Sequence, residues 1–350
     1  MTSPAPSKPI RIGLLGAGAV AQVAHLPAYR HLHNVELIAL CDNEKTKLRA
    51  LKDRTGVSHA VSSIDELLAI DEVEAVDICL PSDLHRDAVI RCLEAGRHVL
   101  CEKPLALTPV DVQAIVEAQR NSGKILLVGM NNRYRGDSIL LKSFIEDNAL
   151  GDIFYARAGW LKRRDAFKKG AWHYQRSRAG GGVLMDLGVQ LLDLTLWFCG
   201  YPEPERVVAQ FSSLRPDVDV EDSAVAMLKC AGGLTITLEA SWHFLMDSDH
   251  HFLNLFGSDG SGLLNPIRVF QRMHDSLVNV TPQGQPSIGN IYIESYQREI
   301  AFFGEVAAGR GEAPPLDEQI TLARALAAIQ RSAGEGREVM VKPAPEAGAQ

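Results

Sequence analysis

Three polar side chains interrupt an apolar stretch near the middle of the chain, in the sequence GGGVLMDLGVQLLD at residues 180–193. Asp186, Gln190 and Asp193 follow one another at spacings of four and three, which places them along one face of an α-helix. Burying such groups without partners is costly, so the stripe needs a polar partner. Three glycines, residues 180–182, run directly into this apolar stretch.

A second set of residues has the spacing of a dinucleotide-binding turn. Residues 16–21, GAGAVA, fit the pattern G-x-G-x-x-[GA] directly after the apolar run IRIGLL. Gly16 would form the tight turn, and Gly18 would let the backbone approach a pyrophosphate. Ala19 and Val20 begin a helix whose free N–H groups face the phosphates. Asp42 ends the next apolar run, 26 residues after Gly16, where a carboxylate can bind a ribose hydroxyl. Because an Asp there repels a 2′-phosphate, NAD is favoured over NADP.

The elements that would position these residues alternate over the first third of the chain. Short apolar runs (IRIGLLG, VELIALCD, AVDICLP, HVLCEKP and KILLVG) are separated by helix-like stretches such as DVQAIVEAQRNSG. Strands that are apolar on both faces and alternate with helices indicate a parallel sheet covered on both sides. We therefore expect an N-terminal, doubly wound Rossmann domain over residues 9–129.

The pattern changes after about residue 129. Longer strands with alternating apolar and polar residues follow one another, among them IFYARAGWL, RVVAQFSS, SAVAMLKC and LTITLEASWHF. The stretch DEQITLARALAAIQRSAGEG is a clear amphipathic helix. We expect residues 130–343 to form an α+β domain with a large, mainly antiparallel open sheet, and residues 1–8 and 344–350 to be flexible tails.

Composition excludes several classes of protein. The 350 residues carry a net charge of −7 with no basic block, which argues against nucleic acid as a partner. No signal peptide or membrane span is expected, so we predict a cytoplasmic protein with no membrane partner. Six cysteines form no C-x-x-C pair and are expected to be reduced core residues. His250 and His251 would point to opposite sides of a strand, and no metal site is expected.

The ordered set of motifs resembles the Gfo/Idh/MocA family of NAD(P)-dependent oxidoreductases. The likeness runs from the glycine fingerprint with His25 beyond it, through LPSDLH (80–85) and Glu102-Lys103-Pro104, to VGMNNRY (128–134). It continues through GGGVLMDLGVQLLD to AIQRSAGEGREVMV (328–341). The resemblance implies a Rossmann domain followed by an α/β domain whose sheet mediates homodimers or homotetramers. It also implies hydride transfer between NAD and a hydroxyl group of a sugar, polyol or related compound.

By the same resemblance, Lys103 reaches both the nicotinamide ribose and the reacting hydroxyl. The chemistry is consistent, because oxidation of an alcohol requires a group that removes its proton. A partly desolvated lysine beside a cationic ring has its pKa lowered toward working pH. The expected cofactor-binding residues are Gly16, Gly18, Ala19, Val20, Asp42, Leu80, Pro81, His85, Glu102, Lys103 and Asn131.

Further residues are candidates for contact with the substrate. Arg133 follows the strand that leaves the first domain and is expected to point into an interdomain cleft. Trp172, in the polar loop KKGAWHYQ, either stacks on a sugar ring or closes a surface loop over the core. Arg157 and Lys162 are expected to be solvated charges.

The family pattern in the second domain is an Asp followed four residues later by a His. Here the pair is Asp186 and Gln190. A glutamine amide orients a hydroxyl but does not transfer a proton near pH 7. The favoured interpretation is a dehydrogenase in which Lys103 handles the proton, while Asp186 and Gln190, facing it across the cleft, position the substrate. Two alternatives stay open: a cofactor-assisted lyase, hydrolase or epimerase without net redox change, and a non-catalytic regulator that binds nucleotide and sugar.

Overall fold

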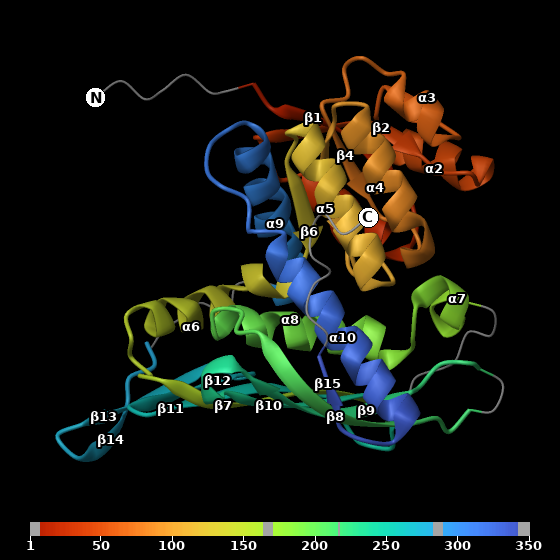
Figure 1. Ribbon diagram of the computed structural model, residues 1–350. Helices are drawn as coiled ribbons and strands as arrows, with labels where there is room; N and C mark the ends of the chain where they lie inside the picture. The colour runs from red at the N-terminus through yellow and green to blue at the C-terminus, as the bar shows by residue number, and fades with distance from the viewer. Residues whose placement is uncertain (1–7, 164–170, 216–217, 283–289, 342–350) are drawn as a thin grey trace, which may run out of the picture. The chain divides into compact units, whose positions relative to one another are not determined.

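The computed structural model describes residues 8–163, 171–215, 218–282 and 290–341. The chain forms two compact units (Figure 1). Among the described residues, the first unit contains 8–106, 110–135 and 290–315, and the second contains 107–109, 136–163, 171–215, 218–282 and 316–341. Of the two predicted tails, only Lys8 lies among the described residues.

The first unit is built on a six-stranded parallel sheet with the strand order β3-β2-β1-β4-β5-β6. This is the doubly wound order of dinucleotide-binding domains. The central strands are apolar on both faces, as expected for a sheet covered by helices. The strands are β1 (Ile10–Leu15), β2 (Val35–Cys41), β3 (His59–Val61), β4 (Ala75–Ile78), β5 (His98–Glu102) and β6 (Leu126–Gly129).

Helices connect these strands, and one of them comes from much later in the chain. The local helices are η1 (Ala21–His25), α1 (Leu26–Tyr29), α2 (Lys45–Thr55), α3 (Ile64–Leu68), η2 (Ser82–Leu84), α4 (His85–Glu94), α5 (Pro109–Ser122) and η3 (Asn131–Tyr134). The late helix, α9 (Ile291–Ala307), packs against η1, α1 and η3. Its Ile300 and Phe303 are fully buried in the same core as Leu14, Leu40 and Leu100. The first unit is therefore discontinuous in sequence.

This discontinuity differs from the predicted domain boundaries. A single division between residues 129 and 130 assigns α9 to the second domain, whereas α9 packs with the first unit. The helix is amphipathic in either setting, so its sequence pattern alone does not identify the sheet that it covers.

The second unit is built on a nine-stranded sheet with the order β14-β13-β12-β11-β7-β10-β9-β8-β15. Every neighbouring pair is antiparallel except β7 and β10, which are parallel. The sheet is therefore mainly antiparallel, as predicted. Its strands are β7 (Ile153–Arg163), β8 (Pro204–Ser212), β9 (Ser223–Cys230), β10 (Thr235–Phe244), β11 (His250–Gly257), β12 (Gly260–Leu264), β13 (Arg268–Met273), β14 (Ser276–Asn279) and β15 (Val339–Met340).

Helices cover one face of this sheet and leave the other open (Figure 1). Alternate residues of β9, Ala224, Ala226 and Leu228, are buried, while Val225 and Met227 between them are exposed. This is the alternation expected of an antiparallel sheet with a single covered face. The helices of the unit are α6 (Gly136–Glu146), η4 (Trp172–Tyr174), α7 (Arg176–Ala179), η5 (Leu184–Gly188), α8 (Val189–Phe198), η6 (Ala231–Gly233) and α10 (Asp317–Glu335).

One helical run, Arg176–Phe198, is long and apolar enough to cross a membrane by length and composition alone. In the structure 89% of its most apolar 18-residue window is buried within the fold. Core helices of globular proteins meet the same criterion, so this run is weak evidence for a span.

Candidate cofactor and catalytic site

The chain turns sharply after β1, at Gly16. Its φ is +93°, and a Cβ atom there would lie 2.8 Å from the carbonyl oxygen of Cys79, just beyond β4. Both the backbone conformation and this close approach require glycine. The strand order reverses between β1 and β4, and nucleotides bind at such a switch point in open α/β sheets.

Few protein atoms surround the position that a side chain on Gly18 would occupy. A Cβ atom there would have a single neighbour within 4 Å, the carbonyl oxygen of Cys79 at 4.0 Å. No contact within the described protein therefore requires glycine, and the missing side chain leaves the main chain accessible. Ala19 and Val20 begin the helical run, and Ala21 is fully buried against the sheet. This accessible helix start has the form of a pyrophosphate cradle.

Asp42 lies just beyond β2 and connects this turn to the neighbouring strand. Its Oδ2 accepts a hydrogen bond from the main-chain N–H of Ala17 at 2.9 Å, and its Oδ1 accepts one from Glu44 at 2.8 Å. Burial raises the pKa of this carboxyl, but the hydrogen bonds from Lys47, Glu44 and Ala17 outweigh it and hold the pKa below its usual value. The carboxylate is therefore ionised and fixed beside the turn.

Lys47 is a neighbour of Asp42 that the sequence did not single out. Its Nζ lies 2.8 Å from Asp42 Oδ2 and 3.5 Å from Glu44 Oε2. Lys47 is in the first turn of α2, five positions after Asp42, and that proximity in sequence was the only available signal. The carboxylate predicted to repel a 2′-phosphate thus has a positive charge next to it.

His85 joins the two loops that follow β4 and β5. Its Nε2 lies 2.8 Å from the carbonyl oxygen of Leu80, and its Nδ1 lies 2.7 Å from that of Pro104. The residue is 1% exposed, whereas Leu80 and Pro81 are partly exposed. Burial lowers the pKa of His85 below its usual value, although both carbonyl oxygens favour the protonated ring. Both ring nitrogens of this predicted cofactor residue are thus engaged by the protein itself.

Glu102 ends β5, and its two carboxylate oxygens have different partners. Its Oε2 accepts the main-chain N–H of Lys103 at 3.1 Å, and its Oε1 lies 3.1 Å from Nε2 of His25. Although burial acts in the opposite direction, His25 and Lys103 hold the pKa of Glu102 below its usual value. An ionised, buried carboxylate therefore anchors the backbone at Lys103, at the carboxyl end of a central strand.

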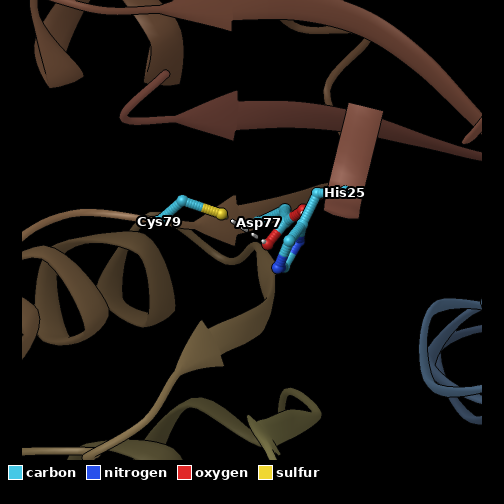
Figure 2. A group of neighbouring side chains, drawn as sticks. All are labelled: His25, Asp77 and Cys79. Atoms are coloured by element: carbon cyan, nitrogen blue, oxygen red, sulfur yellow. Dashed lines mark hydrogen bonds and ion pairs between the residues drawn. The ribbon is translucent and has the colours of Figure 1, made fainter. Parts of the chain in front are cut away.

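His25, Asp77 and Cys79 form a buried cluster in the core of the first unit (Figure 2). Their potential ligand atoms lie within 4.8 Å of one another. However, His25 Nδ1 is 2.8 Å from Asp77 Oδ2, and the thiol of Cys79 donates to Asp77 Oδ1 at 3.7 Å. Burial raises the pKa of Cys79 to about 12, so the side chain is a thiol that can donate this hydrogen bond. Hydrogen bonds within the protein account for the cluster without an ion.

Asn131 and Arg133 lie on η3, which follows β6, and both are buried. The amide nitrogen of Asn131 donates to the hydroxyl of Ser295 on α9 at 2.9 Å. The predicted cofactor residue is thus held by the late helix that completes this unit.

In the second unit, Asp186 lies on η5 and is held by a tryptophan. Nε1 of Trp242, on β10, donates a hydrogen bond to Asp186 Oδ2 at 3.0 Å. Trp242 continues the even-numbered series Ile236, Leu238 and Ala240, which is buried under the helices. No sequence motif marks Trp242, although this alternation could have indicated that it faces the helix carrying Asp186.

The predicted polar stripe separates into two parts. Asp186 and Gln190 are partly exposed, whereas Asp193 is buried and accepts a hydrogen bond of 2.5 Å from the hydroxyl of Tyr201. The regular α-helical spacing assumed for the stripe holds only from Val189 onward. Before it lies a π-helical turn, in which the N–H of Val189 binds the carbonyl of Leu184 five residues earlier. Such turns are frequent at functional sites.

The glycine run makes its close approach to Glu221 within the same unit. A Cβ atom on Gly182 would lie 1.8 Å from the carbonyl oxygen of Glu221. The side-chain Oε1 of Glu221 also accepts the N–H groups of Gly182 and Leu184, at 2.8 and 3.2 Å. Gly180, with φ at +77°, ends α7. The glycines thus fix the start of the helix that carries Asp186.

Trp172 belongs to a group of aromatic rings next to Trp242. Its ring centroid lies 5.9 Å from that of His173, and His173 lies 6.5 Å from Trp242. Tyr174 packs edge-on against Trp242 at 5.5 Å. The structure therefore connects the predicted substrate residue Trp172 to the tryptophan that binds Asp186.

Comparison with known proteins places the whole arrangement in a family. Residues 10–130 match the GFO/IDH/MocA family model described as an oxidoreductase family with an NAD-binding Rossmann fold. Residues 139–262 match the model of the GFO/IDH/MocA C-terminal domain.

Similar proteins act on sugars and polyols. The D-glucoside 3-dehydrogenase of Escherichia coli (strain K12) is 26% identical, and the alignment covers 97% of this chain and 99% of the relative. The myo-inositol 2-dehydrogenase of Thermotoga maritima (strain ATCC 43589 / DSM 3109 / JCM 10099 / NBRC 100826 / MSB8) is 28% identical, covering 87% and 91%. A levoglucosan dehydrogenase solved in complex with NADH and levoglucosan superposes with a TM-score of 0.86 at 25% identity, covering 95% of this chain and 100% of that structure.

Proposed function

The chain belongs to the GFO/IDH/MocA family of oxidoreductases, and we propose from this premise that it transfers hydride between NAD and a hydroxyl group of a sugar or polyol. One observation carries the substrate class: full-length similarity to a levoglucosan dehydrogenase in complex with NADH and its sugar. The open main chain at Gly18 and the ionised Asp42 fit the dinucleotide chemically.

In this proposal the first unit holds NAD through residues at the carboxyl ends of its strands. Gly16, Gly18, Ala19 and Val20 bind the pyrophosphate, and Asp42 binds a ribose hydroxyl. The loops that His85 joins, with Leu80, Pro81, Glu102, Lys103 and Asn131, line the nicotinamide end. His85 acts there by holding the two loops together, as its hydrogen bonds to Leu80 and Pro104 support.

Lys103 moves the proton in this mechanism. NAD supplies the hydride acceptor. The amine of Lys103 takes the hydroxyl proton during oxidation and returns it to the carbonyl during reduction. The hydrogen bond from its main-chain N–H to the buried Glu102 fixes the position of this lysine.

The second unit contributes the groups that orient the substrate. Asp186 accepts hydrogen bonds from substrate hydroxyls, and Trp242 holds its carboxylate in one orientation. Gln190 donates and accepts hydrogen bonds but takes no part in proton transfer. We also assign substrate contact to Arg133 and to the ring of Trp172.

The open face of the nine-stranded sheet is the proposed contact between subunits of a homodimer or homotetramer. Val208, Val225 and Met227 lie exposed on the two adjacent strands β8 and β9. Contiguous exposed apolar groups of this kind mark interaction surfaces. We place the protein in the cytoplasm, which is supported by six cysteines that are all free thiols.

A panel assay tests the reaction. The protein is mixed with NAD and a series of sugars and polyols, and the absorbance of reduced nicotinamide is followed. Turnover of at least one member is expected. Retained NAD binding without turnover of any member would contradict the proposal and favour either a reaction without net redox change or a regulator.

A substitution tests the assignment of the proton-transferring group. Lys103→Ala is expected to lower kcat on the identified substrate by at least about 100-fold, because the alcohol loses its base. NAD affinity, measured by calorimetry, is expected to change little. A variant with full activity would exclude Lys103 as the acid/base.

A further inference from the structure

His25 is a buried side chain that the proposed reaction does not yet use. It ends the π-helical turn η1 and is fully buried. Its two ring nitrogens bind two different carboxylates: Nδ1 lies 2.8 Å from Asp77 Oδ2, and Nε2 lies 3.1 Å from Glu102 Oε1. These carboxylates come from the neighbouring strands β4 and β5.

The geometry determines the charge of this ring. An ionised carboxylate only accepts hydrogen bonds, so two carboxylates need two N–H donors from His25. A neutral imidazole has one, and only the imidazolium has both. Although burial alone lowers the pKa of His25, its attraction to Asp77 raises it well above the usual value. His25 is therefore a cation held between two carboxyl groups.

Asp77 is surrounded by hydrogen-bond donors. Besides His25, the hydroxyl of Tyr29 on α1 donates to its Oδ2 at 2.8 Å, and the thiol of Cys79 faces its Oδ1. Burial raises the pKa of Tyr29 far above its usual value, so the phenol stays protonated. Burial likewise keeps the thiol of Cys101, on β5, protonated by raising its pKa.

Helix α9 covers the remaining side of the ring with neutral groups. The ring of Tyr296 packs against His25 with centroids 5.1 Å apart. Glu299 is fully buried, and neither carboxyl oxygen has a hydrogen-bond partner among the described residues. Burial, and then the charge of Glu102, raise the pKa of Glu299 well above the usual value, although His25 and Arg133 act in the other direction. Glu299 is thus protonated, and the network holds one positive and two negative charges.

Glu102 connects this network to the proposed catalytic lysine. One of its oxygens binds His25, and the other binds the main-chain N–H of Lys103. The positive charge of Lys103 also contributes to the low pKa of Glu102, so the two side chains interact electrostatically. Any change in the charge of the network must therefore act on the amine.

We propose that His25 is a positioning residue for Lys103, whose charge holds Glu102 ionised and in place and limits the negative potential at the amine. The proposal rests on the proposed role of Lys103 in proton transfer. Without the imidazolium, Asp77 and Glu102 lose their counter-charge and favour the ammonium form of Lys103. Because the neutral amine is the working base, the pKa that limits oxidation at low pH then rises.

The first test measures His25 directly and needs no substrate. The NAD-bound protein is labelled with ¹⁵N, and His25→Asn identifies the ring signals by their loss. Both ring nitrogens are expected to stay protonated from about pH 6 to about pH 9, whereas an ordinary histidine loses its proton near pH 6.5. A neutral ring at pH 7 would overturn the proposal.

The second test follows kcat against pH with NAD and the sugar or polyol found in the panel. In His25→Gln the acid limb is expected to move to higher pH by about one unit. In Asp77→Asn, which removes a negative charge and keeps an acceptor oxygen, the limb is expected to move to lower pH. Glu299→Gln is the matched control, because it changes a buried neutral group into another and is expected to leave the limb unchanged.

The outcomes separate the two claims. In one outcome Lys103→Ala is inactive, but the acid limb of the kcat–pH profile is the same in His25→Gln, Asp77→Asn and the parent protein. The proposal for His25 is then wrong, while the proposed role of Lys103 stands. Equal shifts in Glu299→Gln and His25→Gln would show that disturbed packing moves the limb, which also overturns the proposal. If His25→Gln does not fold, Asp77→Asn and the ¹⁵N measurement still decide it. Full activity of Lys103→Ala would instead overturn the proposed mechanism itself.

Discussion

Asp42 combines two tasks in one carboxylate. It closes the turn at Ala17 through a hydrogen bond, and it presents a negative charge where the ribose of the cofactor is expected. The sequence indicated the second task from the distance to Gly16. Its only signal for Lys47, which shares the carboxylate with Ala17, was the short distance along the chain.

Asp42→Asn tests this balance. The amide oxygen still accepts from one of the two N–H groups, but the negative charge is lost, and Lys47 then attracts a 2′-phosphate. The ratio of kcat/KM for NAD to that for NADP is expected to fall by at least about 10-fold, equivalent to about 1.4 kcal/mol. Glu36→Gln, an exposed site on β2, serves as control and should keep the parental ratio. An unchanged ratio in Asp42→Asn would mean that Asp42 does not select the cofactor.

Trp242→Phe tests the orientation of Asp186. The phenyl ring keeps most of the packing but cannot donate the hydrogen bond to Asp186 Oδ2. Losing one hydrogen bond to a charged group costs about 1.5–3 kcal/mol, so kcat/KM is expected to fall by at least about 10-fold while NAD affinity stays the same. Trp197→Phe is the control. It also removes an indole from the second unit, but this indole contacts Lys142, so kcat/KM is expected to change little. Equal losses in both variants would argue against a specific role for Trp242.

At the scale of elements, the sequence predicts long periodic segments well and local irregularities poorly. The apolar runs at IRIGLL and VELIALC form β1 and β2, and the amphipathic stretch after residue 316 forms α10, which ends at Gly336. The two π-helical turns η1 and η5 were not predicted, because one extra residue per turn leaves an apolar pattern almost unchanged. Yet η1 ends at His25 and η5 carries Asp186.

The start of η5 gives the sharpest stability prediction. Gly182→Ala places a methyl group 1.8 Å from the carbonyl oxygen of Glu221, so the segment before β9 or the helix start must move. We expect a loss of about 3 kcal/mol or more in the free energy of unfolding, measured by urea denaturation. Gly334→Ala in α10 meets no neighbour within 4 Å and should stabilise the protein by up to about 1 kcal/mol. Similar stability of the two variants would contradict the close packing at Glu221.

At the scale of the whole molecule, substitutions on the open face of the nine-stranded sheet test whether this face is the contact between subunits. Replacing Val225 and Met227 together with lysine puts charges on adjacent exposed positions of β9. The molar mass of the double variant, measured by light scattering after size-exclusion chromatography, is expected to be that of a monomer at concentrations where the parent protein is a dimer or tetramer. Val110→Lys, on an exposed position of α5, should leave the mass unchanged. A monomeric parent, or an unchanged mass of the double variant, would contradict an interface on this face.

The discontinuity of the first unit is the part of the architecture that the sequence could not reveal. Helix α9 has an amphipathic pattern that suits either sheet, and only the folded chain pairs Phe303 with the core around Leu40. The order of synthesis makes this pairing consequential. A growing chain has made all of β7 to β14 before Ile300 and Phe303 exist. The cofactor-binding unit starts first and is completed late, so a chain interrupted before α9 leaves an apolar core exposed to aggregation.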